Sequence, residues 1–434
     1  MQAILKAGTA QADITPPPGS IMACFPRRRT PHDPGNPSIP GKPDRIPRCP
    51  GRAHDRLKAR ALVLASESEI VALCVCDVPH FDRVDVDRIR AMTTKRVREL
   101  SGCRVILAGT HTHSGADTLY LFGNEPSDPV IHEMDAAIAA AIEEAYNDLE
   151  EVTPYVGRTD LHLTHNRRVR DEDGKARMAM EYEEGITTGP VDPELFVLRL
   201  DSARGAKAIL FNYTAHALTL GPANTEFSAD YPGEACRHIE EAFPGALAIF
   251  TNGAAGNVHP RQCMRGDFEV MEKTGKDLAE GVMRTAGKAR CLPQLNLVHE
   301  SRILTFPHVR DPCIQVKPEI HAVRIGRFAV GFVPGEFFVE FQLAFKKRLR
   351  PDPAVLVGYC GGWTGYVPTC ADYEAGGYGV TEDTADPLER SRTSLPPGAG
   401  EQIIDELVGL AQGTGTEWGQ DRPIQCTGMS FTGH

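Results

Sequence analysis

Histidine, glutamate and tyrosine residues follow apolar segments that are typical of β-strands. The run VILAGT leads to His111 and His113, and AILFNYTA leads to His216. In the same way AVGFVP leads to Glu336, and VLVGYCGGWTG leads to Tyr366. Ligands of α/β proteins bind beyond the carboxyl ends of strands, where the chain leaves the sheet. We therefore expect these side chains to meet in one cleft.

These residue types suggest a metal site, and each also has a simpler interpretation. The motif HTHSG places His111 and His113 two residues apart, so both imidazoles would point to one side of an extended backbone and could bind one metal ion. The pair could equally be loop histidines that bind nothing, and His216 could be a hydrogen-bonded core residue. Glu336 would suit a helix N-terminus, where the helix dipole stabilises a carboxylate, and Tyr366 would suit packing.

The composition narrows the class of protein. Of the 434 residues, 41% are hydrophobic and 24% are charged, as in ordinary globular enzymes. The formal net charge of -11 lacks the basic excess that binds a phosphate backbone, so nucleic acid is not an expected partner. No apolar run is long enough for a transmembrane helix, and the N-terminal residues lack a signal-peptide pattern. We expect a cytoplasmic protein without a membrane span.

Strand and helix patterns alternate from residue 57 onward. Two apolar runs, ARALVLAS and EIVALCVCDV, predict a hairpin. Later periodicities predict helices over 83–100, 130–149, 233–243, 268–287, 336–348 and 401–412, and strands over 104–110, 206–214, 246–251, 319–334 and 354–359. This alternation predicts an α/β fold with mixed β-sheet layers flanked by helices.

The chain is expected to form a single catalytic domain over residues 1–434. Pro, Gly and Arg dominate the first 56 residues, which favours an extended, loop-like segment. Its cluster of Arg27, Arg28 and Arg29 could bind an anionic group of a substrate or could form a solvated turn. Residues 366–400 are rich in Gly and Pro and are expected to form a long active-site loop.

The order of motifs resembles that of neutral ceramidases and their shorter bacterial relatives, over most of residues 7–380. The matching blocks are GTAQADITPPPGSIM, LKARALVL, AGTHTHSG, HNR, NYTAH, SADYPG, NGAAGN, PGEF and GYVPTCADYEAGGY. The resemblance implies the fold of the neutral ceramidase catalytic domain. It also implies one catalytic Zn2+ bound by four side chains, which here are His111, His216, Glu336 and Tyr366.

The resemblance also implies roles for neighbouring residues. Zinc lowers the pKa of a bound water to about 7, and that water is the expected nucleophile. His113 would act as general base or hold the scissile carbonyl. Arg167 in HNRR and Tyr378 in GGY match an arginine and a tyrosine of the family, and both would stabilise the developing oxyanion. Asp230 in SADYPG could orient a ligand histidine or cap the following helix.

The sequence departs from the family pattern after the strand ALAIF, which leads to TNGAAGNVHP. Ceramidases have a serine that is required for activity where this chain has His259. We expect His259 at the cleft, as a proton shuttle or substrate donor or as a structural residue. No segment corresponds to the C-terminal β-sandwich domain of long ceramidases, or to the apolar helix with which some of them approach a bilayer.

The sequence therefore predicts a zinc-dependent hydrolase that attacks an amide, ester or lactone carbonyl of a small molecule. An anionic or sugar-like substrate is favoured over a long-chain sphingolipid, because the N-terminal segment is basic and the active-site loop is polar. One alternative is a ceramidase, which would hydrolyse N-acylsphingosine. Another is a protein that uses zinc for ligand binding or lyase-type chemistry without hydrolysis. The oligomeric state stays open.

Overall fold

The computed structural model describes residues 4–25, 53–121, 124–179, 182, 184, 189–380 and 393–414. The cluster of Arg27, Arg28 and Arg29 lies outside these residues. Among the helices of the described part, none combines the length and the apolar character needed to cross a membrane.

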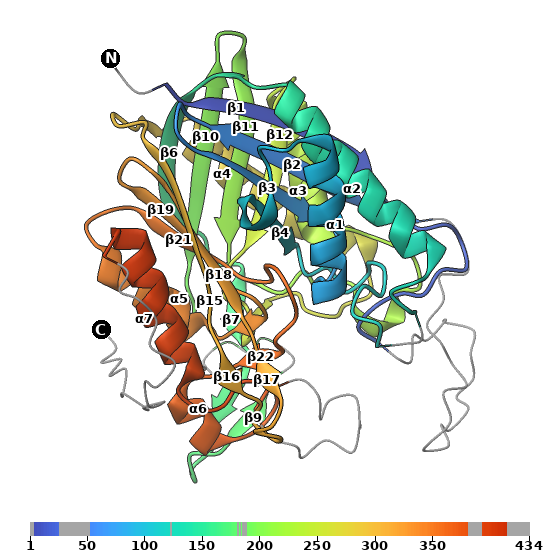
Figure 1. Ribbon diagram of the computed structural model, residues 1–434. Coiled ribbons are helices and arrows are strands. Elements are labelled where there is room, and N and C mark those ends of the chain that lie inside the picture. The colour runs from blue at the N-terminus through green and yellow to red at the C-terminus, as the bar shows by residue number, and fades with distance from the viewer. Residues whose placement is uncertain are drawn as a thin grey trace.

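Three mixed sheets form the framework, and helices cover their outer faces (Figure 1). The first sheet has the strand order β4-β3-β2-β1-β5. Its strands are β1 (Lys6–Asp13), β2 (Lys58–Ala65), β3 (Ile70–Cys76), β4 (Val105–Gly109) and β5 (Glu150–Glu151). Strands β3 and β4 are parallel, and the other neighbours are antiparallel. Helices α1 (Arg83–Arg96) and α2 (Pro129–Asn147) pack together on this sheet.

The second sheet has the order β12-β11-β10-β6-β14. Its strands are β6 (Thr153–Asp160), β10 (Glu194–Ser202), β11 (Gly205–Tyr213), β12 (Leu247–Asn252) and β14 (Arg290–Cys291). Strands β11 and β12 are its parallel pair. Helices α3 (Asp230–Ala242) and α4 (Phe268–Ala286) pack against each other and against this sheet.

The third sheet has the order β15-β18-β19-β21. Its strands are β15 (Leu297–Ile303), β18 (Glu319–Ile325), β19 (Phe328–Phe332) and β21 (Ala354–Val357), of which the last two are parallel. Helices α5 (Val339–Leu349) and α7 (Ala399–Gln412) cover it. Short strand pairs complete the fold: β7 (Thr164–Asn166) with β13 (Val258–Pro260), β8 (Arg168–Arg170) with β9 (Ala176–Met178), β16 (Phe306–Pro307) with β17 (Gln315–Val316), and β20 (Glu336–Phe337) with β22 (Tyr366–Val367).

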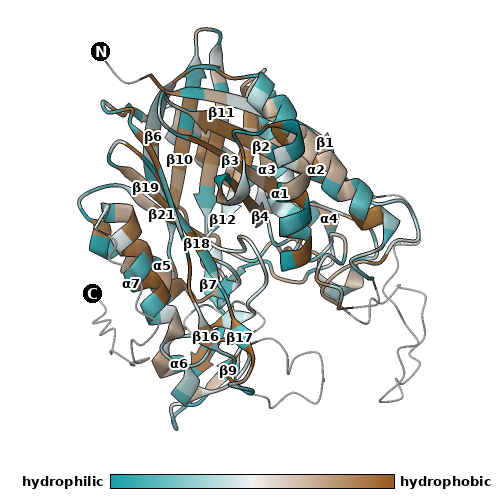
Figure 2. Cartoon of the chain, in the orientation of Figure 1, coloured by the Kyte–Doolittle hydropathy of each residue, from teal (hydrophilic) through white to brown (hydrophobic). Residues whose placement is uncertain are grey.

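Side chains from all three sheets share one apolar core. Leu62 of the first sheet, Leu198 of the second and Val330 of the third belong to the same buried cluster. The rings of Phe196 and Phe328 stack between the second and third sheets, with centroids 4.7 Å apart. The strands are accordingly the most hydrophobic elements, while the helices turn polar residues outward (Figure 2). Burial of this apolar area holds the sheets together.

Each sheet contains one parallel pair, and a helix connects its two strands. The units are β3-α1-β4, β11-α3-β12 and β19-α5-β21. The strand ends of different units are hydrogen-bonded to one another: Gly358 N–H donates to Asn252 O at 3.0 Å, and Gly361 N–H donates to Leu107 O at 2.9 Å. The carboxyl ends of strands from all three sheets therefore lie close together.

The expected fold class of mixed sheets flanked by helices is confirmed, and the expected helices and strands are found within a few residues of their predicted bounds. Two segments differ. Residues 6–13, in the region expected to be loop-like, form β1, because its eight residues pair with β2 along their full length. The expected long loop over 366–400 contains β22, helix α6 (Cys370–Ala375) and the start of α7, while residues 381–392 lie outside the described part.

Truncating the inter-sheet stack should destabilise the whole protein. Phe196→Ala removes a fully buried ring that contacts Phe328, so we expect a loss of about 3–5 kcal/mol in the free energy of unfolding. Val84→Ala is the control, because Val84 is 48% exposed and should change stability by less than about 0.5 kcal/mol. Denaturant unfolding measures the free energy of unfolding of both variants, and equal losses would contradict a core shared by the sheets.

Candidate metal centre

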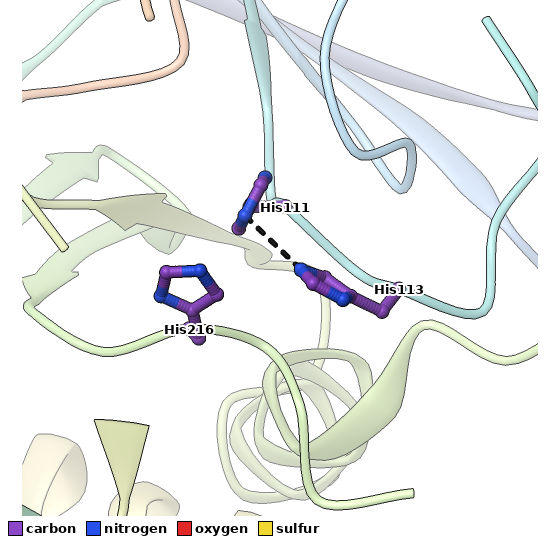
Figure 3. Close-up of side chains that lie close together, drawn as sticks. All are labelled: His111, His113 and His216. Carbon is purple, nitrogen blue, oxygen red and sulfur yellow. Dashed lines mark hydrogen bonds between the residues drawn. The ribbon is translucent and has the colours of Figure 1, made fainter. Parts of the chain in front are cut away.

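Two histidines and one glutamate converge on a single buried point. His111 follows β4, His216 follows β11 and Glu336 begins β20. The Nε2 atom of His111 lies 3.3 Å from Glu336 Oε2, and His216 Nε2 lies 3.2 Å from the same oxygen. All three side chains are buried. Figure 3 shows the two imidazoles pointing toward each other from separate segments.

Backbone carbonyls fix the tautomers of both imidazoles. His111 Nδ1 lies 2.9 Å from Pro79 O, and His216 Nδ1 lies 2.8 Å from Ala255 O. A carbonyl only accepts hydrogen bonds, so Nδ1 carries the proton of each neutral ring and Nε2 presents its lone pair. Ligand histidines of metal sites commonly have this arrangement.

The atoms that face one another at the centre are then all acceptors. His216 Nε2 and Glu336 Oε2 are buried and make no hydrogen bond within the described part of the chain. Their separation of 3.2 Å is that of an ion pair, yet neither atom has a proton to share in this tautomer. A cation between these atoms would satisfy all of them, so the donor set fits a divalent metal.

His113 brings a third imidazole to the same point. Its Nε2 atom lies 3.1 Å from His111 Nε2, and the ligand atoms of His111, His113 and His216 all lie within 4.8 Å of one another. His113 is therefore close enough to bind a metal itself, as well as to exchange a proton with a group bound there. The spacing of the two histidines in the sequence allowed the first role, whereas the resemblance implied only the second.

Burial and charge set the protonation states that metal binding needs. Burial, and then the nearby Arg167, lower the pKa of His216 to about 4. The pKa of His113 is also well below its usual range, mainly because of burial and then because of His111. Burial alone would raise the pKa of Glu336, whereas positive charge at the centre, here that of protonated His111 and His216, holds this pKa well below the usual range. Neutral imidazoles and an ionised carboxylate are the forms that bind metals.

Glu336 does not cap a helix, so that interpretation is wrong. It lies in β20, paired in parallel with β22, and its register partner is Tyr366. Helix α5 begins only at Val339, with Phe338 as its N-cap. The pairing of two short strands therefore brings the carboxylate and the tyrosine side by side, a long-range contact that helical periodicity cannot reveal.

A buried arginine connects the tyrosines to the centre. Arg167 donates to His259 Nε2 at 2.9 Å, to Tyr366 OH at 3.1 Å and to Gly256 O. Its guanidinium carbon lies 4.7 Å from the ring centroid of Tyr378, whose hydroxyl lies 3.4 Å from that of Tyr366. Within the described residues Arg167 forms no ion pair with a carboxylate. Its positive charge is thus available to a phenolate or to a negatively charged group of a ligand.

His259 lies beside this arginine, with its ring centroid 5.1 Å from that of His216. Because Nε2 accepts from Arg167, Nδ1 carries the proton and faces Cys263 Sγ at 3.3 Å. Both ring nitrogens therefore have protein partners. This arrangement favours positioning of Arg167 over direct proton transfer, and the role of His259 stays a prediction.

The carboxylate of Asp230 joins the segment after β11 to the start of α3. It accepts hydrogen bonds from the backbone N–H groups of Thr219, Leu220 and Tyr231 at the start of α3. Among the described contacts it makes none with a histidine, and the N-cap of α3 is Ala229 without a side-chain cap hydrogen bond, so neither expected role of Asp230 is observed.

Sequence reasoning missed Tyr359. Its ring stacks on that of His111 with centroids 4.0 Å apart. The residue ends the predicted strand AVLVGY, so its place after a strand was a usable signal.

Part of the chain matches a known family, and its fold matches solved structures. Residues 51–265 match the family described as neutral/alkaline non-lysosomal ceramidase, N-terminal. None of the curated proteins matches the chain significantly. A solved structure described as a ceramidase complexed with C2 superposes with a TM-score of 0.74 at 18% identity, over 94% of this chain and 75% of that one. Neutral ceramidase from Pseudomonas aeruginosa gives a TM-score of 0.73 at 17% identity, over 100% of this chain and 79% of that one. The expected resemblance in fold is thereby confirmed.

Metal analysis of purified variants tests the donor set. His111→Ala and His216→Ala should each lose the metal, which we expect at about one ion per chain in the parent protein, since each removes a lone pair from the centre. His132→Ala is the control, because His132 is exposed on α2.

The fourth ligand can be identified in the same experiment. If Tyr366 is the ligand, Tyr366→Phe should lose metal affinity by about 10-fold or more while His113→Ala keeps it. The reverse result would assign His113 as the third imidazole ligand. Parent protein without any metal would contradict the centre as a whole.

Proposed function

We propose that this protein uses zinc to hydrolyse an amide, ester or lactone of a small substrate, and the match of residues 51–265 to the neutral/alkaline non-lysosomal ceramidase family supports the proposal. One observation carries the proposal: two buried imidazoles and one buried carboxylate present acceptor atoms 3.2 and 3.3 Å apart. Such a set is costly to bury unless it binds a cation.

Zinc would be held by His111, His216 and Glu336, with Tyr366 as the fourth ligand. Nitrogen and oxygen donors suit zinc, and they would also accept manganese, iron or cobalt. A zinc ion supplies Lewis acidity, which lowers the pKa of water and polarises a carbonyl group. The described residues supply the other requirements of the reaction.

His113 is the proposed proton carrier. Its pKa is well below the usual range, mainly because of burial, so the imidazole is neutral near neutral pH and can hydrogen-bond to an attacking water. Its Nε2 atom already lies 3.1 Å from a ligand atom of the centre, which is within reach of an attacking water.

Arg167 and Tyr378 are the proposed oxyanion stabilisers. Arg167 is buried and forms no ion pair with a carboxylate in the described part of the chain, so its charge is fixed in place before the reaction. Fixed donors of this kind stabilise negative charge more than water does, because they need no reorganisation. The same charge supports a substrate with an anionic or strongly polar group near the scissile carbonyl.

Ceramide hydrolysis is the second candidate. The similarity in fold to two solved ceramidases, which extends over nearly the whole chain, favours it. His259 weighs against it, because the sequence resemblance places this residue where ceramidases have a required serine, and its Nε2 accepts a hydrogen bond from Arg167.

Hydrolysis should depend on the metal and on Arg167. Short-chain p-nitrophenyl esters, N-acyl amino acids and lactones form the substrate panel. Dialysis against a chelator should abolish turnover, and added zinc should restore it. Arg167→Met should lower kcat by about 100-fold or more with little change in metal content, because the oxyanion loses a charged donor. Turnover that survives complete metal removal would rule out the proposal.

A direct comparison of substrates separates the two candidates. Short-acyl ceramide in detergent should be cleaved at a kcat/KM at least about 100-fold below that of the best small substrate, because the polar centre offers little to a lipid chain. The same panel is run with His259→Ser. Efficient ceramide cleavage by the parent protein would favour the ceramidase alternative instead.

A further inference from the structure

Tyr359 links the two segments that carry proposed metal ligands. It follows β21, and its N–H donates to Gly335 O at 3.2 Å, directly before Glu336. Its carbonyl accepts from Gly109 N–H at 3.0 Å, at the end of the strand that leads to His111. The backbone of Tyr359 therefore has a fixed position relative to both ligands.

Backbone strain is concentrated at this contact. Tyr359 has a φ of 59° and His111 a φ of 66°, both in the left-handed region that disfavours residues with a side chain. Their rings stack with an interplanar angle of 24°. Such conformations are costly and persist where the surrounding structure enforces them, frequently at functional sites. The stacked pair is one place where stability alone does not explain the choice of residue.

The hydroxyl group of Tyr359 has no hydrogen-bond partner in the described part of the chain, although the residue is completely buried. Two other buried tyrosines differ: the hydroxyl of Tyr213 donates to Leu161 O at 2.7 Å, and that of Tyr231 donates to Ala215 O at 3.1 Å. A phenylalanine at position 359 would avoid the cost of an unsatisfied hydroxyl. The hydroxyl is therefore expected to have a partner outside the described residues, such as a bound substrate.

The charged groups around this hydroxyl belong to the candidate centre. Glu336, Tyr366 and Arg167 are its principal electrostatic neighbours. The hydroxyl is thus near the carboxylate that would bind the metal and near the guanidinium that would stabilise an oxyanion. No other tyrosine hydroxyl among the described residues combines these neighbours with the lack of a protein partner.

We propose that Tyr359 is a further catalytic residue, whose hydroxyl donates a hydrogen bond to the carbonyl oxygen of the bound substrate while its ring fixes His111. The inference rests on the proposed hydrolase function. It adds a donor to Arg167 and Tyr378, and its neutral hydroxyl would strengthen the hydrogen bond as negative charge develops on the oxygen.

Tyr359→Phe tests the hydroxyl because it keeps the ring and its stacking. We expect an unchanged metal content and a melting temperature that is unchanged or higher, since an unsatisfied buried group is removed. The kcat should fall by about 10-fold or more, with KM changed by less than about threefold, because the hydrogen bond strengthens only in the transition state.

Tyr213→Phe is the matched control. Its hydroxyl also accepts from Leu163 N–H at 3.0 Å, so the substitution breaks two hydrogen bonds to the backbone before β7 and none to a proposed site residue. We expect a lower melting temperature and unchanged kcat. The two tyrosines should therefore show opposite patterns of stability and activity.

Binding of acetohydroxamate to the zinc-loaded protein gives a readout that does not depend on turnover. Tyr359→Phe should weaken this binding by about 10-fold, as measured by calorimetry, because a donor to the bound oxygen is lost. Unchanged kcat together with unchanged acetohydroxamate affinity would overturn the role of Tyr359. A parent protein that binds zinc and acetohydroxamate but hydrolyses nothing would instead count against the proposed function.

Discussion

Three buried acceptor atoms facing one another are the constraint on which the rest of the site depends. His111 Nε2, His216 Nε2 and Glu336 Oε2 repel each other in the protonation states that their surroundings impose. Protonation of an imidazole could relieve this repulsion, but burial lowers the pKa of His216 to about 4. A cation relieves it without that cost. The folded chain is thus preorganised for a metal, and its stability should be coupled to metal binding.

The scaffold meets this constraint by repeating one arrangement. Each sheet contributes a parallel pair of strands joined by a helix, and parallel strands direct their following loops to the same edge. His111 comes from the first unit, His216 from the second, and both Glu336 and Tyr359 from the third. Hydrogen bonds between the strand ends, such as Gly109 N–H to Tyr359 O, hold the units in register. Side chains distant in sequence therefore meet with little freedom.

Elements with a strong periodic pattern could be predicted from the sequence, whereas contacts set by tertiary pairing could not. Helices α2 and α4 have long apolar faces, and each strand before a site residue is a short apolar run. Strand β1, KAGTAQAD, has small and polar residues, so only its pairing with β2 defines it. The position of His111 and His216 directly after predicted strands was enough to predict that they share one cleft. The backbone carbonyls of Pro79 and Ala255 orient the two imidazoles, but any residue type has a carbonyl, so the sequence could not predict these contacts. The lack of a hydrogen-bond partner for the Tyr359 hydroxyl could not be predicted either.

Charge balance gives a physical reason to prefer Tyr366 over His113 as the fourth ligand. A divalent metal, ionised Glu336 and Arg167 together leave two excess positive charges in a buried site, and burial penalises net charge strongly. A neutral His113 ligand would not change that excess, whereas an ionised Tyr366 would reduce it by one, with the guanidinium 3.1 Å away to stabilise the phenolate. The remaining positive charge would attract the oxyanion that forms when His113 takes the proton of the attacking water. A centre with this charge is most complementary to the transition state of carbonyl hydrolysis, and less so to a neutral substrate.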